Sequence, residues 1–160
     1  MKRLEGESEK EAIRCMEVAV TLTRRALCHN AKCGTVIVKD SKVIGKGYNA
    51  PPLDKEENRV CGKELGLGKP RYDRTCCMHA EWRAVMDALK KNPEKLAGSK
   101  LYFTRVDGEG KIIRSGKPYC TVCSRMALDA GIGTFVLWHE EGICEYPTEE
   151  YNHLSYEYEE

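Results

Sequence analysis

The sequence predicts an α/β protein: a three-layer α/β/α sandwich around a mixed sheet of about five strands. Two observations lead to this prediction. Segments with helical spacing of apolar residues alternate with short runs rich in β-branched residues. The first two of those runs are separated only by Asp40-Ser41, which suits a hairpin turn. Strands that alternate with helices after an initial hairpin place helices on both faces of a single sheet.

The first third of the chain is predicted to form one helix and this hairpin. The helix is expected over residues 8–28, with Ser8 as its N-cap and Glu11 three residues later. Its buried face is expected to consist of Ile13, Met16, Val20 and Leu27. The two strands of the hairpin are expected at 35–39 and 42–48.

The remaining elements alternate between helix and strand. They are predicted, in order, as helix 80–91, strand 100–106, helix 121–130 and strand 134–138. Pro93 should stop the first of these helices, and Gly131 should end the second. In the long link between strand and second helix, Ile112 and Ile113 suit a small additional hairpin.

A single domain, 1–160, is expected from the length, with two segments that stand apart from the core pattern. Residues 50–78 form a predicted insertion that is rich in proline, glycine and charge. Because loops longer than about 12 to 15 residues are often functional lids, we expect this one to cover the substrate. Residues 140–160 form a predicted acidic C-terminal tail.

The charge is unevenly distributed along the chain. Residues 1–125 contain 26 basic and 16 acidic side chains, whereas 126–160 contain nine acidic side chains and no basic ones. We expect the tail to be solvated, although its four tyrosines also suit a final strand and a short helix. The net charge of +1 makes broad binding to nucleic acid less favoured than binding of a small phosphorylated molecule.

The composition, with 41% hydrophobic and 32% charged residues, is that of a protein outside the membrane, because no apolar run is long enough to cross a bilayer. The N-terminal residues lack the apolar core of a secretory signal, so a cytoplasmic location is expected. In a reducing compartment the nine cysteines should be free thiols or metal ligands.

His79, Cys120 and Cys123 are candidate zinc ligands, and Glu81 is a candidate for proton transfer. Imidazole and thiolate suit zinc, and a catalytic zinc site has three protein ligands and leaves one position to water. At positions i and i+3 of a helix's first turn, two cysteines lie where amide N–H groups stabilise thiolates. Alone, the cysteine pair would fit a redox pair or two buried thiols equally well, and the histidine would more often be a cap or surface residue. Their combination favours a metal site.

Three segments of the sequence, spanning about residues 12–139, resemble the cytidine and deoxycytidylate deaminase superfamily, and most closely its deoxycytidylate and tRNA-adenosine branches. These segments are 33–38 through 47–49, then 78–81, then 118–123 with 130–132 behind it. One difference is that Tyr119 separates Pro118 from Cys120, where the family usually places the proline directly before the cysteine. The resemblance implies the same sandwich architecture and a Zn²⁺ cofactor.

The resemblance also implies a hydrolytic deamination. Glu81 would accept a proton from a zinc-polarised water and deliver protons to the ring nitrogen and the leaving amine. The backbone N–H of Ala80 and the side chain of Asn49 would hydrogen-bond the base, although asparagine is also common at a strand-to-turn position. Trp138 would stack on the base, although a tryptophan that closes a strand more often serves in packing.

Two further sets of residues are weaker candidates. Basic residues in loops near the expected site could contact a phosphate: Arg71, Arg74, Arg114 and Lys117. A second, structural zinc site, which some deoxycytidylate deaminases have, could draw on Cys28, His29, Cys33, Cys61, Cys76 and Cys77. Their spacings match no compact zinc motif, and buried cysteines often act as small apolar residues.

The leading hypothesis is therefore a zinc-dependent hydrolase that converts a cytosine nucleotide, deoxycytidylate, to its uracil product and ammonia. One alternative is a deaminase acting on a base within RNA or single-stranded DNA, favoured only by the excess of basic residues in 1–125. Another is a catalytically silent zinc-binding scaffold, which the presence of Glu81 disfavours. The resemblance further implies a homo-oligomer.

Overall fold

The structure, a computed structural model, describes residues 1–29, 31–60 and 77–158. Within this part of the chain there is one seven-stranded mixed sheet. Its strands are β1 (Lys2–Arg3), β2 (Lys32–Lys39), β3 (Lys42–Tyr48), β4 (Lys100–Val106), β5 (Ile112–Ile113), β6 (Thr134–His139) and β7 (Gly142–Pro147). The strand order is β1-β7-β6-β4-β2-β3, with β5 beside β4, and the pair β4–β6 is parallel while the other pairs are antiparallel.

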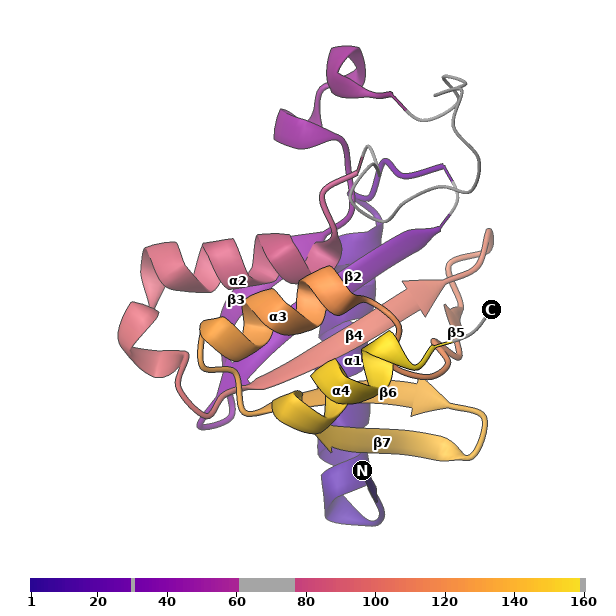
Figure 1. Ribbon diagram of the computed structural model, residues 1–160. Coiled ribbons are helices and arrows are strands. Elements are labelled where there is room, and N and C mark those ends of the chain that lie inside the picture. The colour runs from indigo at the N-terminus through magenta and orange to yellow at the C-terminus, as the bar shows by residue number, and fades with distance from the viewer. Residues whose placement is uncertain (30, 61–76, 159–160) are drawn as a thin grey trace.

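Helices cover both faces of this sheet (Figure 1). The helices are α1 (Glu7–Thr23), α2 (Ala80–Lys91), α3 (Thr121–Asp129) and α4 (Thr148–Tyr156). Side chains that alternate along the strands separate two cores: Val36, Tyr102 and Val136 pack with α1, whereas their neighbours face α2, α3 and α4. The three-layer α/β/α prediction is therefore confirmed.

Helix α2 lies close against the edge strand β3 because two glycines leave room for it. A Cβ atom on Gly47 would lie 2.0 Å from the carbonyl oxygen of Ala80, and one on Gly45 would lie 2.5 Å from that of Ala84. Neither distance can be tolerated by a real side chain. The two glycines thus let the backbone of α2 rest on the backbone of β3, which sets where the first turn of α2 lies.

The sheet is larger than the predicted five strands. Beyond the four strands predicted by residue range, it contains β1 and β5, of two residues each, and β7. Strand β1 pairs with β7, from the opposite end of the chain. Two-residue strands carry no period-2 pattern, so only the pairing partner identifies β1, whereas β5 confirms the small hairpin expected at Ile112 and Ile113.

Helix α1 is shorter than expected and buries a different face. It ends at Thr23, and Gly6, with no side-chain cap, is the N-cap. Ser8 instead donates a hydrogen bond from its Oγ to the carbonyl of Glu5, at 2.8 Å. The buried residues are Ala12, Met16, Ala19 and Thr23, so of the predicted face only Met16 is fully buried. Small alanines let α1 lie close to the sheet, and the branched side chains flank the contact.

The acidic C-terminal segment is part of the fold, which corrects the expectation of a solvated tail. Strand β7 extends the sheet, and α4 packs against α3. Ile143, Tyr146 and Tyr151 are at most 4% exposed. Glu145 forms an ion pair with Lys100 at 2.8 Å, and Glu150 pairs with the N-terminal amine of Met1. The apolar residues of the segment point inward, whereas Glu145 and Glu150 pair with basic groups at its margin.

The insertion begins and ends at one antiparallel bridge between Ala50 and Met78. Two short 3-10 turns, Pro52–Asp54 and Glu56–Asn58, follow its start. Arg83 of α2 ties this start to the body through an ion pair with Asp54 at 2.6 Å and a hydrogen bond to the carbonyl of Pro51 at 2.9 Å. Residues 61–76, on which the expected substrate-covering role mainly rests, lie outside the described residues.

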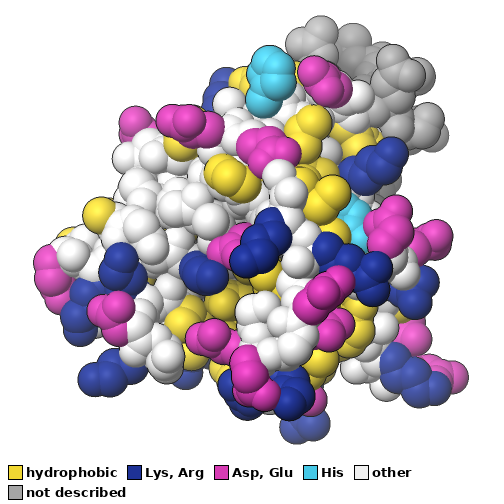
Figure 2. Space-filling view, turned by 90° about the horizontal axis from the view of Figure 1, so that it is seen from below, with side chains coloured by type: hydrophobic (Ala, Val, Ile, Leu, Met, Phe, Trp, Pro, Cys, Tyr) yellow, Lys and Arg dark blue, Asp and Glu magenta, His cyan; other side chains and the backbone are white. Residues whose placement is uncertain are grey.

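Basic and acidic side chains are interspersed over the face seen in Figure 2, so neither charge forms a continuous field there. The uneven charge along the sequence is therefore not reproduced on that face. Among the helices that the structure describes, none has the length and apolar character to cross a membrane.

Candidate functional site

Two helices begin side by side on the face of the sheet opposite α1 (Figure 1). His79 is the N-cap residue of α2, and Cys120 is the N-cap residue of α3. Both residues have extended backbone angles, as a residue that precedes a helix usually does. The first amide N–H groups of both helices therefore lie near these two side chains.

The side chains of His79, Cys120 and Cys123 meet between the two helix ends. The Nδ1 atom of His79 lies 3.2 Å from the Sγ of Cys123 and 3.5 Å from the Sγ of Cys120. All three ligand atoms lie within 4.8 Å of one another, and this is the only such cluster among the described residues. The sequence prediction that these residues come together, despite a gap of about 40 positions, agrees with this geometry.

The two sulfur atoms also contact each other, as in a disulfide. Three observations nevertheless fit a metal site. An imidazole nitrogen lies against both sulfurs, which a disulfide does not require. Both cysteines are 1% exposed, and the backbone N–H of Cys123 donates to the Sγ of Cys120 at 3.2 Å. Such a bond at a helix N-terminus stabilises thiolate, the form that binds zinc. An imidazole and two thiolates form a suitable three-ligand set for zinc.

Glu81 lies in the first turn of α2 and is only 4% exposed. Burial raises the pKa of its carboxyl, and the nearby His79 partly opposes this effect. The negative charge of Glu81 adds to burial in raising the pKa of Cys33, to about 12, and the pKa values of Tyr119 and Tyr151. Glu81 thus lies among these groups beside the metal cluster, in a place where a carboxyl holds a proton more readily than it would in water.

Trp82 is a neighbour of the cluster that the sequence analysis did not identify. Its ring stacks on the His79 ring, with centroids 4.7 Å apart and planes 14° apart. The spacing of three residues along a helix could have suggested this contact. Among the described residues, the buried Nε1 of Trp82 has no hydrogen-bond partner. The stacked ring limits the rotation of the imidazole and so helps to direct Nδ1 toward the sulfurs.

Asn49 binds the protein's own backbone. Its Oδ1 accepts a hydrogen bond from the N–H of Cys33 at 2.8 Å, and its Nδ2 donates to the carbonyl of Ala31 at 2.7 Å. These bonds join the end of β3 to the start of β2, and they leave one amide hydrogen of Asn49 for another partner. Ala80 is fully buried at the first position of α2, next to His79.

Trp138 does not lie where a base-stacking residue was expected. It packs against the core beneath α1, the opposite face of the sheet from Glu81. The physical reason is strand alternation, since Leu137 and His139 face the other side. His139 is 6% exposed, and its Nε2 lies 3.0 Å from the hydroxyl of Tyr146. The geometry thus does not support a stacking role for Trp138.

Within the part of the chain that the structure describes, the weaker candidates lie outside the cluster. Arg114 and Lys117 are exposed, and Arg71 and Arg74 lie outside the described residues. Of the residues considered for a second zinc, Cys28 is partly buried, His29 is exposed, and Cys33 is buried. Cys61 and Cys76 also lie outside the described residues, so the second site stays a sequence-based hypothesis.

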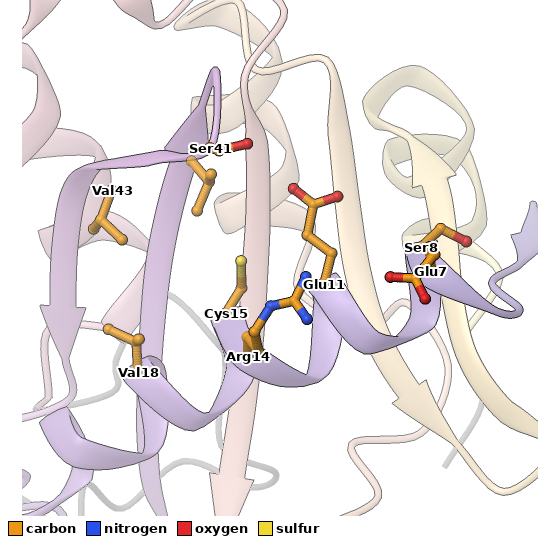
Figure 3. A pocket seen from close by; sticks show the side chains of 9 residues that line it. Glu7, Ser8, Glu11, Arg14, Cys15, Val18, Ser41 and Val43 are labelled. Atoms are coloured by element: carbon orange, nitrogen blue, oxygen red, sulfur yellow. The ribbon is translucent and has the colours of Figure 1, made fainter.

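A separate groove lies on the α1 side of the sheet (Figure 3). Cys15 and Val18 of α1 face Val43 of the hairpin across it, and Glu7 and Glu11 lie farther along the helix. Burial and the charge of Glu11 raise the pKa of the Cys15 thiol. The groove has no group resembling the His79 cluster, so the chemistry of this protein is expected on the other face.

Comparison with known proteins identifies a family that matches this chain and individual relatives of it. A family model described as the cytidine and deoxycytidylate deaminase zinc-binding region matches residues 9–139. The deoxycytidylate deaminase of Mycobacterium phage D29 is 30% identical over 122 residues, covering 72% of this chain and 84% of that protein. The deoxycytidylate deaminase of Saccharomyces cerevisiae is 36% identical over 76 residues, covering 46% of this chain and only 24% of that protein.

Solved structures share the fold. The dCMP deaminase of cyanophage S-TIM5, in complex with dCMP and dUMP, is similar with a TM-score of 0.52, 22% identity and coverage of 82% of each chain. The cytidine deaminase of Burkholderia pseudomallei is similar with a TM-score of 0.56 and 19% identity, covering 87% of this chain and 94% of that one. At these identities the likeness concerns the arrangement of helices and strands.

Proposed function

Because the chain belongs to the cytidine and deoxycytidylate deaminase family, we propose that it is a zinc-dependent hydrolase that converts deoxycytidylate to deoxyuridylate and ammonia. The observation that carries this proposal is the cluster of His79, Cys120 and Cys123 with the buried carboxyl of Glu81 beside it. The choice of deoxycytidylate is supported by the name of the phage D29 relative, whose length the chain largely covers.

In this proposal His79, Cys120 and Cys123 hold the zinc ion. Zinc, when bound, makes a water molecule nucleophilic near neutral pH, which suits attack on the amino-bearing carbon of a pyrimidine. The two helix N-termini keep the cysteines as thiolates, and the Trp82 ring keeps the imidazole aligned. Cys120 and Cys123 are 1% exposed and His79 is partly buried, which limits the access of bulk solvent to the ligand set.

Glu81 moves the protons. Its carboxylate accepts a proton from the attacking water and delivers it to the ring nitrogen. It then accepts the proton of the hydroxyl group added to the ring carbon and delivers it to the leaving amine, as the carbonyl forms. Burial raises the pKa of this carboxyl, which favours the protonated form that donates to the ring nitrogen and to the amine. General acid and base catalysis by one such group usually contributes about 10²- to 10⁴-fold in rate.

We assign the substrate contacts to the start of α2 and the end of β3. The N–H of Ala80 would donate to the base, and the remaining amide hydrogen of Asn49 is available to a substrate oxygen. The two bonds that Asn49 makes to the backbone would keep its amide group fixed. A homo-oligomer and a cytoplasmic location remain part of the proposal; light scattering of the purified protein checks the first, and fractionation of cells checks the second.

An ammonia-release assay tests the function. The purified protein, with its zinc content measured, is given a panel of cytosine, adenine and guanine nucleosides, nucleotides and oligonucleotides. We expect one zinc per chain and the highest kcat/KM with deoxycytidylate, and we expect Glu81→Gln to keep zinc but release ammonia about 10²- to 10⁴-fold more slowly. Turnover of oligonucleotides without turnover of free nucleotides, or no turnover of any compound by the zinc-loaded protein, would contradict the proposal.

A further inference from the structure

Arg83 of α2 reaches from the start of the helix to the chain segment that directly follows Asn49. We propose that its guanidinium is a positioning group for substrate binding, which holds the segment 49–51 in a fixed place relative to Ala80 and Glu81. This inference rests on the proposed function, because Asn49 and Ala80 are the substrate contacts assigned there. It gives the first residues of the insertion a role at the site.

Three acceptors of that segment bind the guanidinium of Arg83. Its Nη1 donates to the Oδ1 of Asp54 at 2.6 Å. Its Nη2 donates to the carbonyl of Pro51 at 2.9 Å and, over a longer distance of 3.4 Å, to that of Ala50. An ion pair exposed to water contributes little to stability, but the Arg83 side chain is only 16% exposed. Because the planar guanidinium donates in fixed directions, it sets the positions of the carboxylate and the carbonyls together.

A second connection joins the same segment to the start of α2. Ala50 and Met78 exchange two backbone hydrogen bonds, of 2.8 and 3.3 Å, and Met78 directly precedes His79. The backbone N–H of Arg83 in turn donates to the carbonyl of His79 at 3.2 Å. The first turn of α2, which contains Ala80, therefore lies between two points of attachment to the segment after β3. With the backbone bridge alone, the segment could turn about that bridge.

Tyr48, the last residue of β3, holds the guanidinium and its partner in place. The guanidinium lies over the Tyr48 ring, 4.8 Å from the centroid, and the Tyr48 hydroxyl donates a hydrogen bond to the Oδ2 of Asp54. Leu53 and Asp54 have positive φ angles, of 60° and 59°, which residues other than glycine rarely adopt. Such a backbone persists only where its surroundings fix it. The two bonds to the Asp54 carboxylate supply this restraint.

Asn49 lies between this anchored segment and the sheet. Its amide group is held by the N–H of Cys33 and the carbonyl of Ala31. These bonds fix the amide relative to the start of β2, whereas Arg83 fixes the next residues relative to α2. A substrate that binds Asn49 and Ala80 together depends on both. Because a misplacement of about 1 Å can cost about 10²-fold in rate, loss of the Arg83 bonds should be measurable.

Two substitutions at Arg83 and one at Arg25 separate positioning from charge. Arg83→Gln removes the charge and the forked donor group. Arg83→Lys keeps the charge but has a single ammonium, which cannot span the carboxylate and the carbonyls in the same way. The matched control is Arg25→Gln, because Arg25 also lies over the Tyr48 ring, at 4.5 Å. Among the described residues, no hydrogen bond joins the Arg25 guanidinium to the segment 49–54.

The experiment measures steady-state ammonia release and bound zinc for the full-length protein, with the nucleotide that the wild type turns over fastest. We expect Arg83→Gln to lower kcat/KM by roughly 10- to 100-fold, mainly through a higher KM, with zinc content unchanged. Arg83→Lys should recover part of the loss, and Arg25→Gln should match the wild type. Thermal melting checks that each variant is folded.

Two further measurements test whether the effect passes through Asn49. In a double-mutant cycle, Arg83→Gln should cost less in the presence of Asn49→Ala than it does alone, because the effects of coupled residues do not add. Amide hydrogen exchange at Ala50 and Met78 should be faster in Arg83→Gln and unchanged in Arg25→Gln, since these amides form the bridge that Arg83 stabilises.

Each outcome bears on the proposal. An unchanged KM in Arg83→Gln, or additive effects in the cycle, would overturn the inference while leaving the proposed function intact. Loss of zinc from Arg83→Gln would also overturn it, since Arg83 would then act on the ligands and not on the substrate contacts. A wild-type protein that turns over no nucleotide would overturn both proposals. If Arg83→Gln fails to fold, Arg83→Lys is measured in its place, and a wild-type KM there overturns the inference.

Discussion

The two faces of the sheet have different contents, although the same strands build both. The face under α1 is filled by aliphatic side chains such as Val36, Val136 and Met16. At its margin, Glu145 forms an ion pair with Lys100. The face under α2, α3 and α4 contains two helix N-termini, a buried carboxyl and the three-residue cluster.

This difference shows how the protein separates stability from chemistry. A buried carboxyl and two closely spaced sulfurs are costly to bury without compensation. On the site face that compensation comes from helix N–H groups and, in our proposal, from zinc. The α1 face needs none of these, so substitutions there should change stability without changing the chemistry. Four predictions test this separation.

The largest effect is expected for Glu81→Gln on the site face. We expect kcat for ammonia release to fall by about 10²- to 10⁴-fold, because the amide cannot transfer the protons. The free energy of unfolding should stay the same or rise, since a neutral group replaces a carboxyl that burial destabilises. Steady-state kinetics and urea denaturation measure the two quantities. A variant that unfolds more easily and loses activity in proportion would contradict the separation of stability from chemistry.

The opposite pattern is expected for Met16→Ala on the α1 face. Met16 is fully buried, and loss of such a side chain usually costs about 2 to 5 kcal/mol of unfolding free energy. The kcat of the folded fraction should be unchanged. Val18→Ala on the same helix is the control, because Val18 is 37% exposed and should lose less than about 0.5 kcal/mol. Reduced kcat in Met16→Ala at a temperature where it is folded would contradict the separation.

Two glycines, one beneath a helix on each face, allow the faces to be compared, because a Cβ atom would clash about equally at both positions. A Cβ on Gly47 would lie 2.0 Å from Ala80, at the start of α2, and one on Gly34 would lie 2.1 Å from Ala19, in α1. Both Gly→Ala variants should lose roughly 1 to 3 kcal/mol of stability, because the helix must move away from the sheet. Only Gly47→Ala should also weaken zinc binding, since it displaces His79. Equal effects on zinc affinity would show that the faces are coupled.

The smallest effect concerns pH and the Glu145–Lys100 pair. Burial alone would raise the pKa of Glu145, but hydrogen bonds from Lys100 and Thr134 outweigh it and lower the pKa. A depressed pKa in the folded state contributes stability above the unfolded value, near 4.3 on the usual scale, and this contribution is lost as pH falls through the folded value. Glu145→Gln should therefore lose less than about 1 kcal/mol at pH 7 and nothing at low pH. Urea denaturation at several pH values, with the exposed Glu140→Gln as control, measures the difference. A loss that does not change with pH would exclude an electrostatic origin.

Much of the fold could be predicted from local patterns. The helix at 80–91 and the strand at 100–106 match the structure residue for residue, because periodicity and the stop at Pro93 are properties of the segments themselves. Asp40 and Ser41 form the hairpin turn with positive φ at both positions, as expected for a two-residue connection. Errors occurred where a neighbour decides, as at the buried face of α1, which the close approach to Gly34 selects.

The candidate site was likewise predictable from the sequence only in part. His79, Cys120, Cys123 and Glu81 were identifiable because zinc chemistry requires these residue types and they cluster in the structure. The neighbour Trp82 was not identified, and Trp138 packs under α1, the packing alternative that the sequence analysis also gave. Aromatic residues occur throughout protein cores, so their type indicates little, and only the arrangement shows which of them touches the site.

The sequence by itself determined the ligand types, the order of helices and strands, and the expectation that one imidazole and two sulfurs would meet. Tertiary structure alone decided that β1 pairs with β7 from the opposite end of the chain, and that Trp82 stacks on the ring of His79. The physical reason is the range of the interactions. Ligand chemistry and periodicity belong to single residues and short segments, whereas strand pairing and buried hydrogen bonds depend on partners that are distant in the chain.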